Sequence, residues 1–357
     1  MPDLDQASPR LRRVAAGLGA LLGLGSAGCS LLGPEVDQLF GGADAGVDSG
    51  ATCDPIKPPE RPPGADTSGP DRAYVLRDII IDQSPDRWET LGFDLDDRCS
   101  LAPEPDVECL PPSGGNPETD GVRGIDNAFG HRLAPTLVGI AANLESDIRG
   151  DQLRGTGGIL LQIRGYNGQA NDPSVEVFMA QTIYAIPHGA TERAAPNWDG
   201  RDRWFLEDSA FDGSADRPRV RNDNAYVRDN WLVVRILDRT DITFNVGEGL
   251  VNFRFISASI VGRISSDGQT LEDVVLSGRW ALRDLALTAD ELGLCQGSVE
   301  RAFLDNSLAN IADVRATPGT GGPGARCDAV SAGLGFRGYR GEFAGLAVTE
   351  DVPIACP

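Results

Sequence analysis

Short runs of β-branched and aromatic residues recur along most of the chain, with Gly, Asn and Asp between them. Apolar and polar positions alternate most clearly from Val251 to Phe255, and a slip near Ile256 predicts a β-bulge. Asp267 and Gly268 separate two such runs and predict a hairpin turn. We expect strands at 74–82, 159–166, 175–186, 231–237, 242–246, 251–264, 274–280, 332–336 and 343–348.

Helical periodicity is confined to two parts of the folded region. Apolar residues recur at helical spacing near 133–153, where Pro135 suits a first turn, and again near 285–314. Because these helices do not alternate with the strands, a parallel βαβ fold is excluded. Many short strands with tight turns are typical of an antiparallel β-sandwich of the jelly-roll or lectin-like type. We therefore expect one mainly β domain over residues 72–357, a sandwich with two or three short helices.

The N-terminus has the layout of a secretory signal. Three arginines at positions 10, 12 and 13 precede residues 14–28, which contain only Val, Ala, Gly, Leu and Ser, and Cys29 follows. The apolar run is 15 residues long, and a membrane-spanning helix needs roughly 20, which disfavours a transmembrane anchor. We expect residues 1–28 to be a signal peptide.

Residues 24–29, LGSAGC, resemble the lipobox of bacterial lipoproteins, although Ser26 stands where that family prefers Leu. The resemblance implies cleavage before Cys29 and a diacylglyceryl thioether on its sulfur, usually with an N-acyl chain. The partner would then be a membrane, reached through a lipid anchor that two or more acyl chains make stable. The resemblance also implies export, and Ser30 favours the outer membrane or cell surface over the inner membrane. The alternative is a plain signal peptide that leaves Cys29 an ordinary thiol.

Residues 29–71 are rich in Gly and Pro and poor in large apolar side chains. Such a segment buries too little apolar surface to offset its ordering entropy. We expect a disordered tether that holds the folded part away from the membrane.

The chain carries a formal net charge of −21 at pH 7. This balance argues against nucleic acid as a partner, because such binding rests on neutralising phosphates with Lys and Arg. It suits a soluble, self-repelling surface and would also suit divalent cations. Lys57 is the only lysine and lies in the Pro-rich segment, which leaves little room for lysine chemistry.

Seven cysteines are present, and six remain if Cys29 is lipidated. An exported compartment is oxidising, so this even number predicts three disulfides. Cys99 and Cys109 flank a Pro-rich acidic loop, and we expect them to pair locally. The other four allow three connectivities, of which we favour Cys295 with Cys327 and Cys53 with Cys356. Zinc is disfavoured, because no CxxC spacing occurs and the chain has two histidines.

The densest polar region, residues 94–127, is a candidate calcium site. Oxygen-bearing side chains at alternate positions before a glycine resemble the opening of an EF-hand or a thrombospondin-type calcium repeat, since Ca²⁺ takes six to eight oxygen ligands. Arg123 and Asn127 depart from the EF-hand pattern, and the alternative is an acidic loop pinned by a disulfide. The candidate ligands are Asp94, Asp96, Asn116, Glu118, Asp120 and Asp126, with Gly121 as the turn residue.

A second cluster, residues 196–204, combines two tryptophans with acidic and basic side chains. Trp198 and Trp204 could stack on a sugar ring while Asp199 and Asp202 bond its hydroxyls, which makes carbohydrate a candidate ligand. The alternative is a turn whose tryptophans pack back onto the sheet.

No catalytic residue can be assigned, because no GxSxG, SxxK or HExxH motif occurs. We expect a cell-envelope lipoprotein with a non-catalytic binding or structural module, whose partner is a carbohydrate or an envelope protein. One alternative is an exported polysaccharide hydrolase that uses a carboxylate pair. The other is a structural module stabilised by calcium.

Three stretches carry a resemblance to the secreted lipoproteins encoded by myxobacteria-like genomes. They are DGVRGIDN at 120–127, ILLQIRGYNGQANDPSVEV at 159–177 and CDAVSAGLGF at 327–336, together with the lipobox at Cys29. The resemblance implies architecture and location and supplies no activity.

Overall fold

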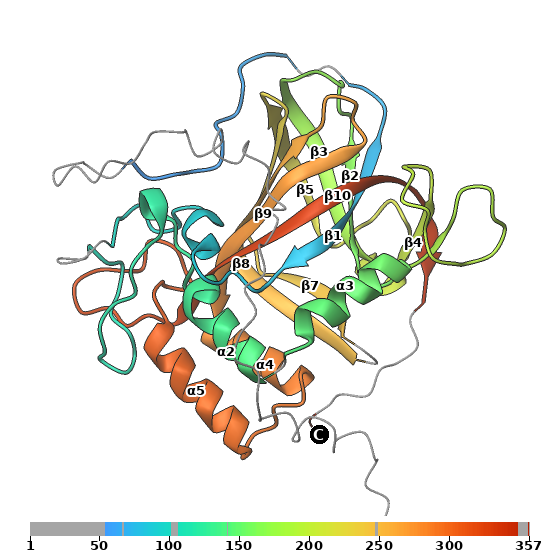
Figure 1. The fold of residues 1–357 in the computed structure, drawn as a ribbon. Coiled ribbons are helices and arrows are strands. Elements are labelled where there is room, and N and C mark those ends of the chain that lie inside the picture. The colour runs from blue at the N-terminus through green and yellow to red at the C-terminus, as the bar shows by residue number, and fades with distance from the viewer. Residues whose placement is uncertain are drawn as a thin grey trace, which may run out of the picture. The chain divides into compact units, whose positions relative to one another are not determined.

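The computed structural model describes residues 54–65, 68–100, 106–140, 142–246, 249–348 and 356. Over these residues the chain forms ten strands. Most of them curve around a common axis (Figure 1). The strands are β1 (Arg72–Ile80), β2 (Ile159–Arg164), β3 (Asp172–Ile186), β4 (Arg203–Glu207), β5 (Arg221–Arg228), β6 (Trp231–Ile236), β7 (Thr240–Val246), β8 (Gly249–Ile264), β9 (Thr270–Ala281) and β10 (Ala329–Ala347).

Eight of these strands close into an antiparallel barrel. The sheet runs in the order β1–β2–β3–β5–β6–β8–β9–β10, and β10 pairs with β1 again. Tyr74 of β1 faces Leu161 on one side and Arg340 on the other, so the first strand has a partner along both edges. The two remaining strands are additions: β7 pairs with the first part of β8, and β4 lies between the ends of β3 and β10.

The expected β-sandwich is therefore wrong, although the fold is mainly β. A sandwich has two sheets with free edges, and here the pairings β1–β10 and β3–β5 remove the edges of the barrel strands. The interior of an eight-stranded barrel is just wide enough for side chains to fill. Buried apolar side chains fill it here, among them Leu76, Leu161, Val177, Leu232 and Leu276.

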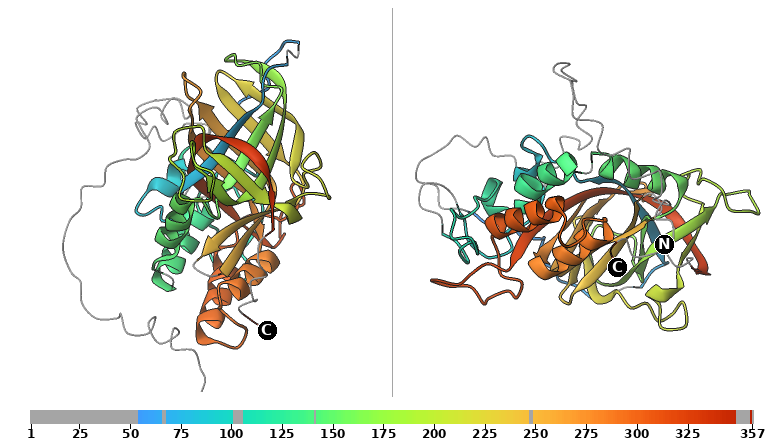
Figure 2. Two further views of the ribbon diagram at one scale, coloured as in Figure 1. Left: turned by 90° about the vertical axis from the view of Figure 1, so that its right-hand side faces the viewer. Right: turned by 90° about the horizontal axis from the view of Figure 1, so that it is seen from below.

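Four α-helices form in the two segments where the periodicity predicts helix, rather than the expected two or three. They are α2 (Ala134–Ile140), α3 (Leu144–Arg154), α4 (Leu282–Glu291) and α5 (Val299–Ile311). Figures 1 and 2 show α2, α4 and α5 gathered at one end of the barrel. No helix of the described residues is long and apolar enough to cross a membrane.

The predicted bulge and hairpin are both present. The register between β8 and β9 shifts after Ile256, where Ser257 has a φ of 51°. The same two strands are joined through Asp267 and Gly268, and Gly268 has the left-handed φ of 67° that the tight turn requires.

Residues 54–65 pack against the barrel domain, so the expected disordered tether is wrong for this part of the segment 29–71. Ile56 is 3% exposed, and its backbone bonds to Arg123 and Asp94. The Arg61 guanidinium lies 4.7 Å from the ring centre of Tyr226 and donates to Asn224. Many small contacts of this kind offset the ordering cost that composition alone suggests.

Candidate metal centre

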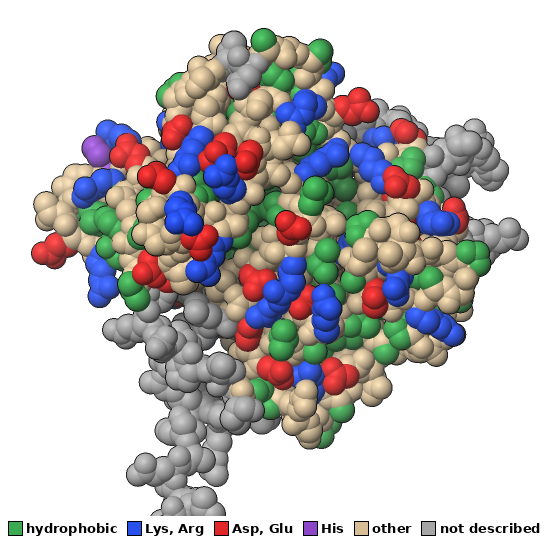
Figure 3. Space-filling model, turned by 180° about the vertical axis from the view of Figure 1, so that it is seen from behind, with side chains coloured by type: hydrophobic (Ala, Val, Ile, Leu, Met, Phe, Trp, Pro, Cys, Tyr) green, Lys and Arg blue, Asp and Glu red, His purple; other side chains and the backbone are tan. Residues whose placement is uncertain are grey.

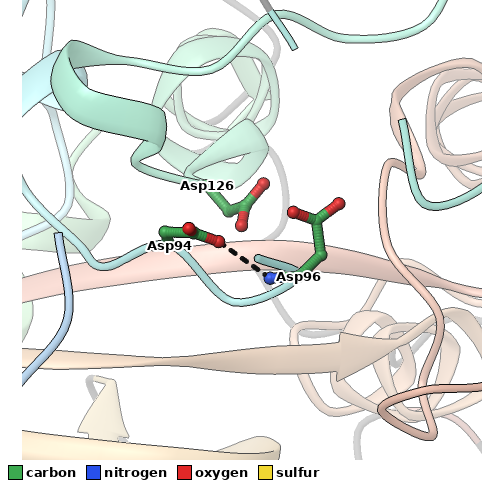
Figure 4. Close-up of side chains that lie close together, drawn as sticks. All are labelled: Asp94, Asp96 and Asp126. Carbon is green, nitrogen blue, oxygen red and sulfur yellow. Dashed lines mark hydrogen bonds between the residues drawn. The ribbon is translucent and has the colours of Figure 1, made fainter. Parts of the chain in front are cut away.

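Three aspartates meet beside the helical end of the barrel (Figure 4). Asp94 and Asp96 lie in the loop after a short helix, η2 (Arg87–Thr90), and Asp126 lies just before a π-helical turn, η4 (Phe129–Leu133). One carboxylate oxygen from each of the three lies within 4.8 Å of the others. The loop and the turn are joined by the bond from the Asp126 amide to the Phe93 carbonyl, at 3.2 Å.

Local hydrogen bonds hold each carboxylate in place. Asp94 Oδ1 accepts from the amides of Asp96 at 3.1 Å and Asp97 at 2.7 Å, which folds the loop around its own side chain. Asp126 Oδ2 accepts from the Leu95 amide at 2.6 Å. Asp94 Oδ2 is buried and accepts no hydrogen bond from any described residue. One acceptor of the cluster therefore has no donor within the described part of the chain.

Asp96 and Asp126 of the cluster line a small cavity of about 10 Å³, and Asp94 is not part of its lining. This volume suits a single water molecule or ion. Its acidic lining comes from four separate segments of the chain: Asp96, Glu118, Asp120, Asp126 and Asp313. Asp313 follows α5 and accepts from the amide and hydroxyl of Ser331 at 2.8 and 2.5 Å.

The cluster raises the pKa of its members, first through burial and then through the charges of neighbouring carboxylates. The pKa of Asp96 rises to about 6, and the pKa values of Asp120 and Asp313 rise to about 7. Burial also holds the pKa of Asp126 well above its usual range, with Asp96 and Asp120 adding to the effect. Burial raises the pKa of Asp94 as well, and the nearby Lys57 opposes this. Upward shifts of this kind mean that the ionised forms lack sufficient compensating positive charge.

Few basic side chains of the described residues lie near the cluster. Lys57 Nζ lies 3.2 Å from Asp94 Oδ1 and 2.7 Å from Asp97 Oδ1. His131 Nδ1 lies 2.5 Å from Glu118 Oε1, and the His131 ring stacks on Trp88 at 3.9 Å. Arg132 Nε also lies 3.6 Å from Glu118 Oε2. These side chains contact the edge of the cluster.

Another basic side chain, Arg279, donates to the Leu95 carbonyl oxygen beside the cluster and opposes the rise in the pKa of Asp96. Its guanidinium is paired with the buried Glu108 at 2.6 Å. Acidic and basic side chains are intermixed on the face that Figure 3 shows.

Five of the six predicted calcium ligands converge here. Asn116 does not, because it is exposed and is not part of the cavity lining. Gly121 does not act as a sharp turn either, since its φ is −77°. It is required by close packing: a Cβ there would lie 2.5 Å from the Glu89 carbonyl oxygen. The ligand geometry is therefore not that of a linear calcium loop.

The predicted carbohydrate platform does not form. Trp204 is 1% exposed and packs in an apolar cluster with Leu206 and Phe178. Arg77 covers the ring of Trp198 at 4.5 Å.

The two aspartates of that cluster have structural partners. Asp202 is buried and accepts from the backbone amides of His188, Asn197 and Trp198. Asp199 is exposed and pairs with Arg201 at 2.9 Å. The alternative, a turn packed back onto the sheet, is what the fold contains.

The disulfides differ from the predicted pairs. Cys109 is bonded to Cys327, and Cys295 is bonded to Cys356. Cys99 is also disulfide-bonded, and its partner is not Cys109. Proximity in sequence was misleading, because the segment after Cys109 runs alongside residue 326 rather than folding back on itself.

Several predictions lie outside the described residues. They are the signal peptide at 1–28, the lipidation of Cys29, and the pairing of Cys53. No family model, curated protein or solved structure matches this chain.

Proposed function

We propose that this protein is a lipid-anchored cell-envelope module whose barrel domain binds Ca²⁺ at the carboxylate cluster and is stabilised by it. The observation that carries the proposal is the meeting of Asp94, Asp96 and Asp126, whose ligand oxygens all lie within 4.8 Å. Two oxygens bound to one Ca²⁺ at roughly 2.3–2.6 Å lie at most about 5.2 Å apart, so a separation within this limit is compatible with a shared ion.

Charge is the first argument for a cation. Three aspartates with raised pKa values line one small cavity, and burial makes their ionised forms costly. A bound divalent ion would compensate this cost, and the carboxylates could then stay ionised without being protonated. Asp94 Oδ2, which is buried and accepts no hydrogen bond within the described part of the chain, offers a ready ligand atom.

The donor set favours calcium over other ions. Every member of the three-residue group is a carboxylate, whereas zinc prefers Cys and His. The ligands come from separate loops, and Ca²⁺ tolerates irregular geometry, whereas Mg²⁺ demands a near-ideal octahedron.

The polysaccharide hydrolase gains less support from this site. An aspartate with a pKa of about 7, such as Asp120, has the property of a general acid. However, the cavity that it lines encloses about 10 Å³, which admits no sugar ring.

Export and anchoring remain part of the proposal and rest on the sequence. The signal-like residues 1–28 and the lipobox cysteine, Cys29, support a lipoprotein. Globomycin treatment with acyl labelling tests this, because the label should be lost in Cys29→Ser.

Calorimetry of the full-length protein tests the calcium proposal. We expect saturating Ca²⁺ to raise the melting temperature by roughly 5 °C over the protein in chelator, since an ion at 100 times its Kd adds about 2.7 kcal/mol. Asp96→Asn and Asp126→Asn should lose the shift. Asp216→Asn, which changes an exposed carboxylate elsewhere, should retain it. A wild-type melting temperature that is the same in Ca²⁺ and in chelator would refute the proposal.

A further inference from the structure

A larger cavity, of about 890 Å³, lies at the end of the barrel where β2 and β5 begin and β6 ends. Small-molecule sites typically have volumes of about 300–1,000 Å³ and often lie at the mouths of β-barrels. The walls come from β2, β3, β7 and the segment that links β4 to β5. The cavity is separate from the carboxylate cluster and has no residue in common with it.

The floor of this cavity is apolar. Ile159 and Met179 belong to the barrel core, and their exposed fractions are 4% and 5%. Ile242 on β7 and Val220 before β5 extend this apolar lining. The floor therefore suits a hydrocarbon group, because burying apolar surface there is favourable.

The two arginines of the rim already have acidic partners. Arg219 Nε lies 3.0 Å from Asp212 Oδ1. Arg239 bonds to Asp284 at 3.2 Å and to Asp241 at 3.3 Å. These ion pairs offset part of the positive charge that both guanidinium groups bring to the rim.

Glu207, at the end of β4, differs from these two arginines because one of its carboxylate oxygens has no partner among the described residues. Its Oε1 accepts from the Ser209 amide at 3.4 Å. Its Oε2 is buried and accepts no hydrogen bond from the residues that the structure describes. Burial raises the pKa of Glu207, and the adjacent Asp208 carboxylate, which also lines the cavity, raises it further. A buried acceptor without a donor is costly, and a ligand that donates a hydrogen bond would satisfy it.

We propose that this cavity binds a small amphiphile, with an alkyl group on the floor formed by Ile159, Met179 and Ile242 and a cationic, hydrogen-bond-donating head on Glu207. An ammonium head fits best, because it supplies donors and positive charge to the Glu207 and Asp208 carboxylates. A hydroxyl head supplies the donor alone and should bind more weakly. A carboxylate head would meet like charge and should bind worst.

Calorimetric titration of the full-length protein with hexylammonium, 1-hexanol and hexanoate tests this site. We expect hexylammonium to bind about tenfold more tightly than hexanoate, with hexanol between them. Glu207→Gln should reduce hexylammonium binding about tenfold and leave hexanol within about threefold, because charge-assisted hydrogen bonds are the stronger class. Val220→Phe should weaken all three by filling the cavity. Asp216→Asn, in the same segment but outside the lining, is the matched control.

Equal or tighter binding of hexanoate would overturn the proposal. So would an unchanged ratio of hexylammonium to hexanoate affinity in Glu207→Gln, unaltered binding in Val220→Phe, or the absence of saturable binding by the wild-type protein. Circular dichroism of each variant checks that the fold is retained. Because none of these readouts depends on the carboxylate cluster, their failure would leave the calcium proposal standing.

Discussion

The ammonium nitrogen of Lys57 lies 3.2 Å from Oδ1 of Asp94, whose side chain is fully enclosed. Lys57 is the only lysine in the chain, and its position just before the barrel brings a single positive charge to the edge of the carboxylate cluster. The Lys57 ammonium also donates to the Asp94 carbonyl oxygen at 2.9 Å. Lys57 thus holds the Asp94 backbone through a hydrogen bond, and its charge would compete with a metal ion for the Asp94 carboxylate.

Lys57→Met should tighten calcium binding. The change retains the apolar stem and removes the charge, so Ca²⁺ would no longer be repelled by the ammonium. We expect about a fivefold lower Kd, equivalent to roughly 1 kcal/mol of coupling. Titration calorimetry measures it, with Arg221→Met, which changes an exposed arginine elsewhere, as control. An equal or higher Kd in Lys57→Met would contradict this role.

In chelator, the protein should become less stable as the pH rises from about 4 to about 8. Asp96, Asp120 and Asp313 have folded-state pKa values of about 6, 7 and 7, raised from 3.8, so the folded state binds more protons than the unfolded state. Stability then falls with pH across this window. The shift at Asp96 alone corresponds to about 3 kcal/mol as an upper bound.

Urea unfolding at several pH values in chelator measures this dependence. Asp313→Asn should flatten the slope, because it removes one group that takes up a proton on folding. Saturating Ca²⁺ should also reduce the loss of stability with rising pH, because the ion binds the ionised carboxylates. A wild-type stability that rises with pH in chelator would contradict the assignment.

Removing one partner of the pair between Arg279 and Glu108 should be strongly destabilising. Both side chains are almost fully buried, and Arg279 also donates to the Arg315 carbonyl oxygen at 2.6 Å. Arg279→Met leaves the Glu108 charge buried without its partner, and we expect a loss of about 3–5 kcal/mol. Urea unfolding checks this, and adding Glu108→Leu to Arg279→Met should recover part of the loss. No recovery in the double variant would show that the bonds to carbonyl groups matter more than the ion pair.

Most barrel strands were predictable, but their closure was not. Alternating side chains define which residues lie in strands, and this alternation is the same in a sandwich and in a barrel. Closure depends on the pairing of β1 with β10, which joins Tyr74 to Arg340 across most of the chain. No local pattern encodes such a contact.

Three strands were misread: β4 (Arg203–Glu207), which was interpreted in part as the tryptophan cluster at 196–204, and β10 and β5. β10 appeared as two short runs, because Gly338 and Gly341 interrupt its apolar pattern. Gly338 is needed there, since a Cβ would lie 2.8 Å from Leu271 Cβ. β5 was missed because its first half, Arg221–Asn224, is polar and largely exposed.

The carboxylate cluster was predictable in composition and not in geometry. A dense acidic stretch pointed to Asp94, Asp96 and Asp126, which do meet. The linear spacing suggested Asn116, which is exposed and outside the cavity lining. Asp313 was missed because it is a single acidic residue after a helix, brought to the cavity by the bonds that it accepts from Ser331.

Replacing the disulfide between Cys109 and Cys327 should weaken both the fold and the calcium site. The bond joins residues 218 positions apart, and its loss should cost about 2–5 kcal/mol. Cys109 also lines the carboxylate cavity, so Cys109→Ser with Cys327→Ser should raise the Kd for Ca²⁺ severalfold.

The disulfide between Cys295 and Cys356 provides the matched control. Neither of its cysteines is part of the cavity lining, so Cys295→Ser with Cys356→Ser should reduce stability and leave the Kd for Ca²⁺ within about twofold. Non-reducing peptide mapping should recover both bonds in the wild-type protein and no peptide that joins Cys99 to Cys109. Equal effects of the two double variants on calcium binding would mean that Cys109 supports the cluster only through global stability, because a local role requires the first pair alone to matter.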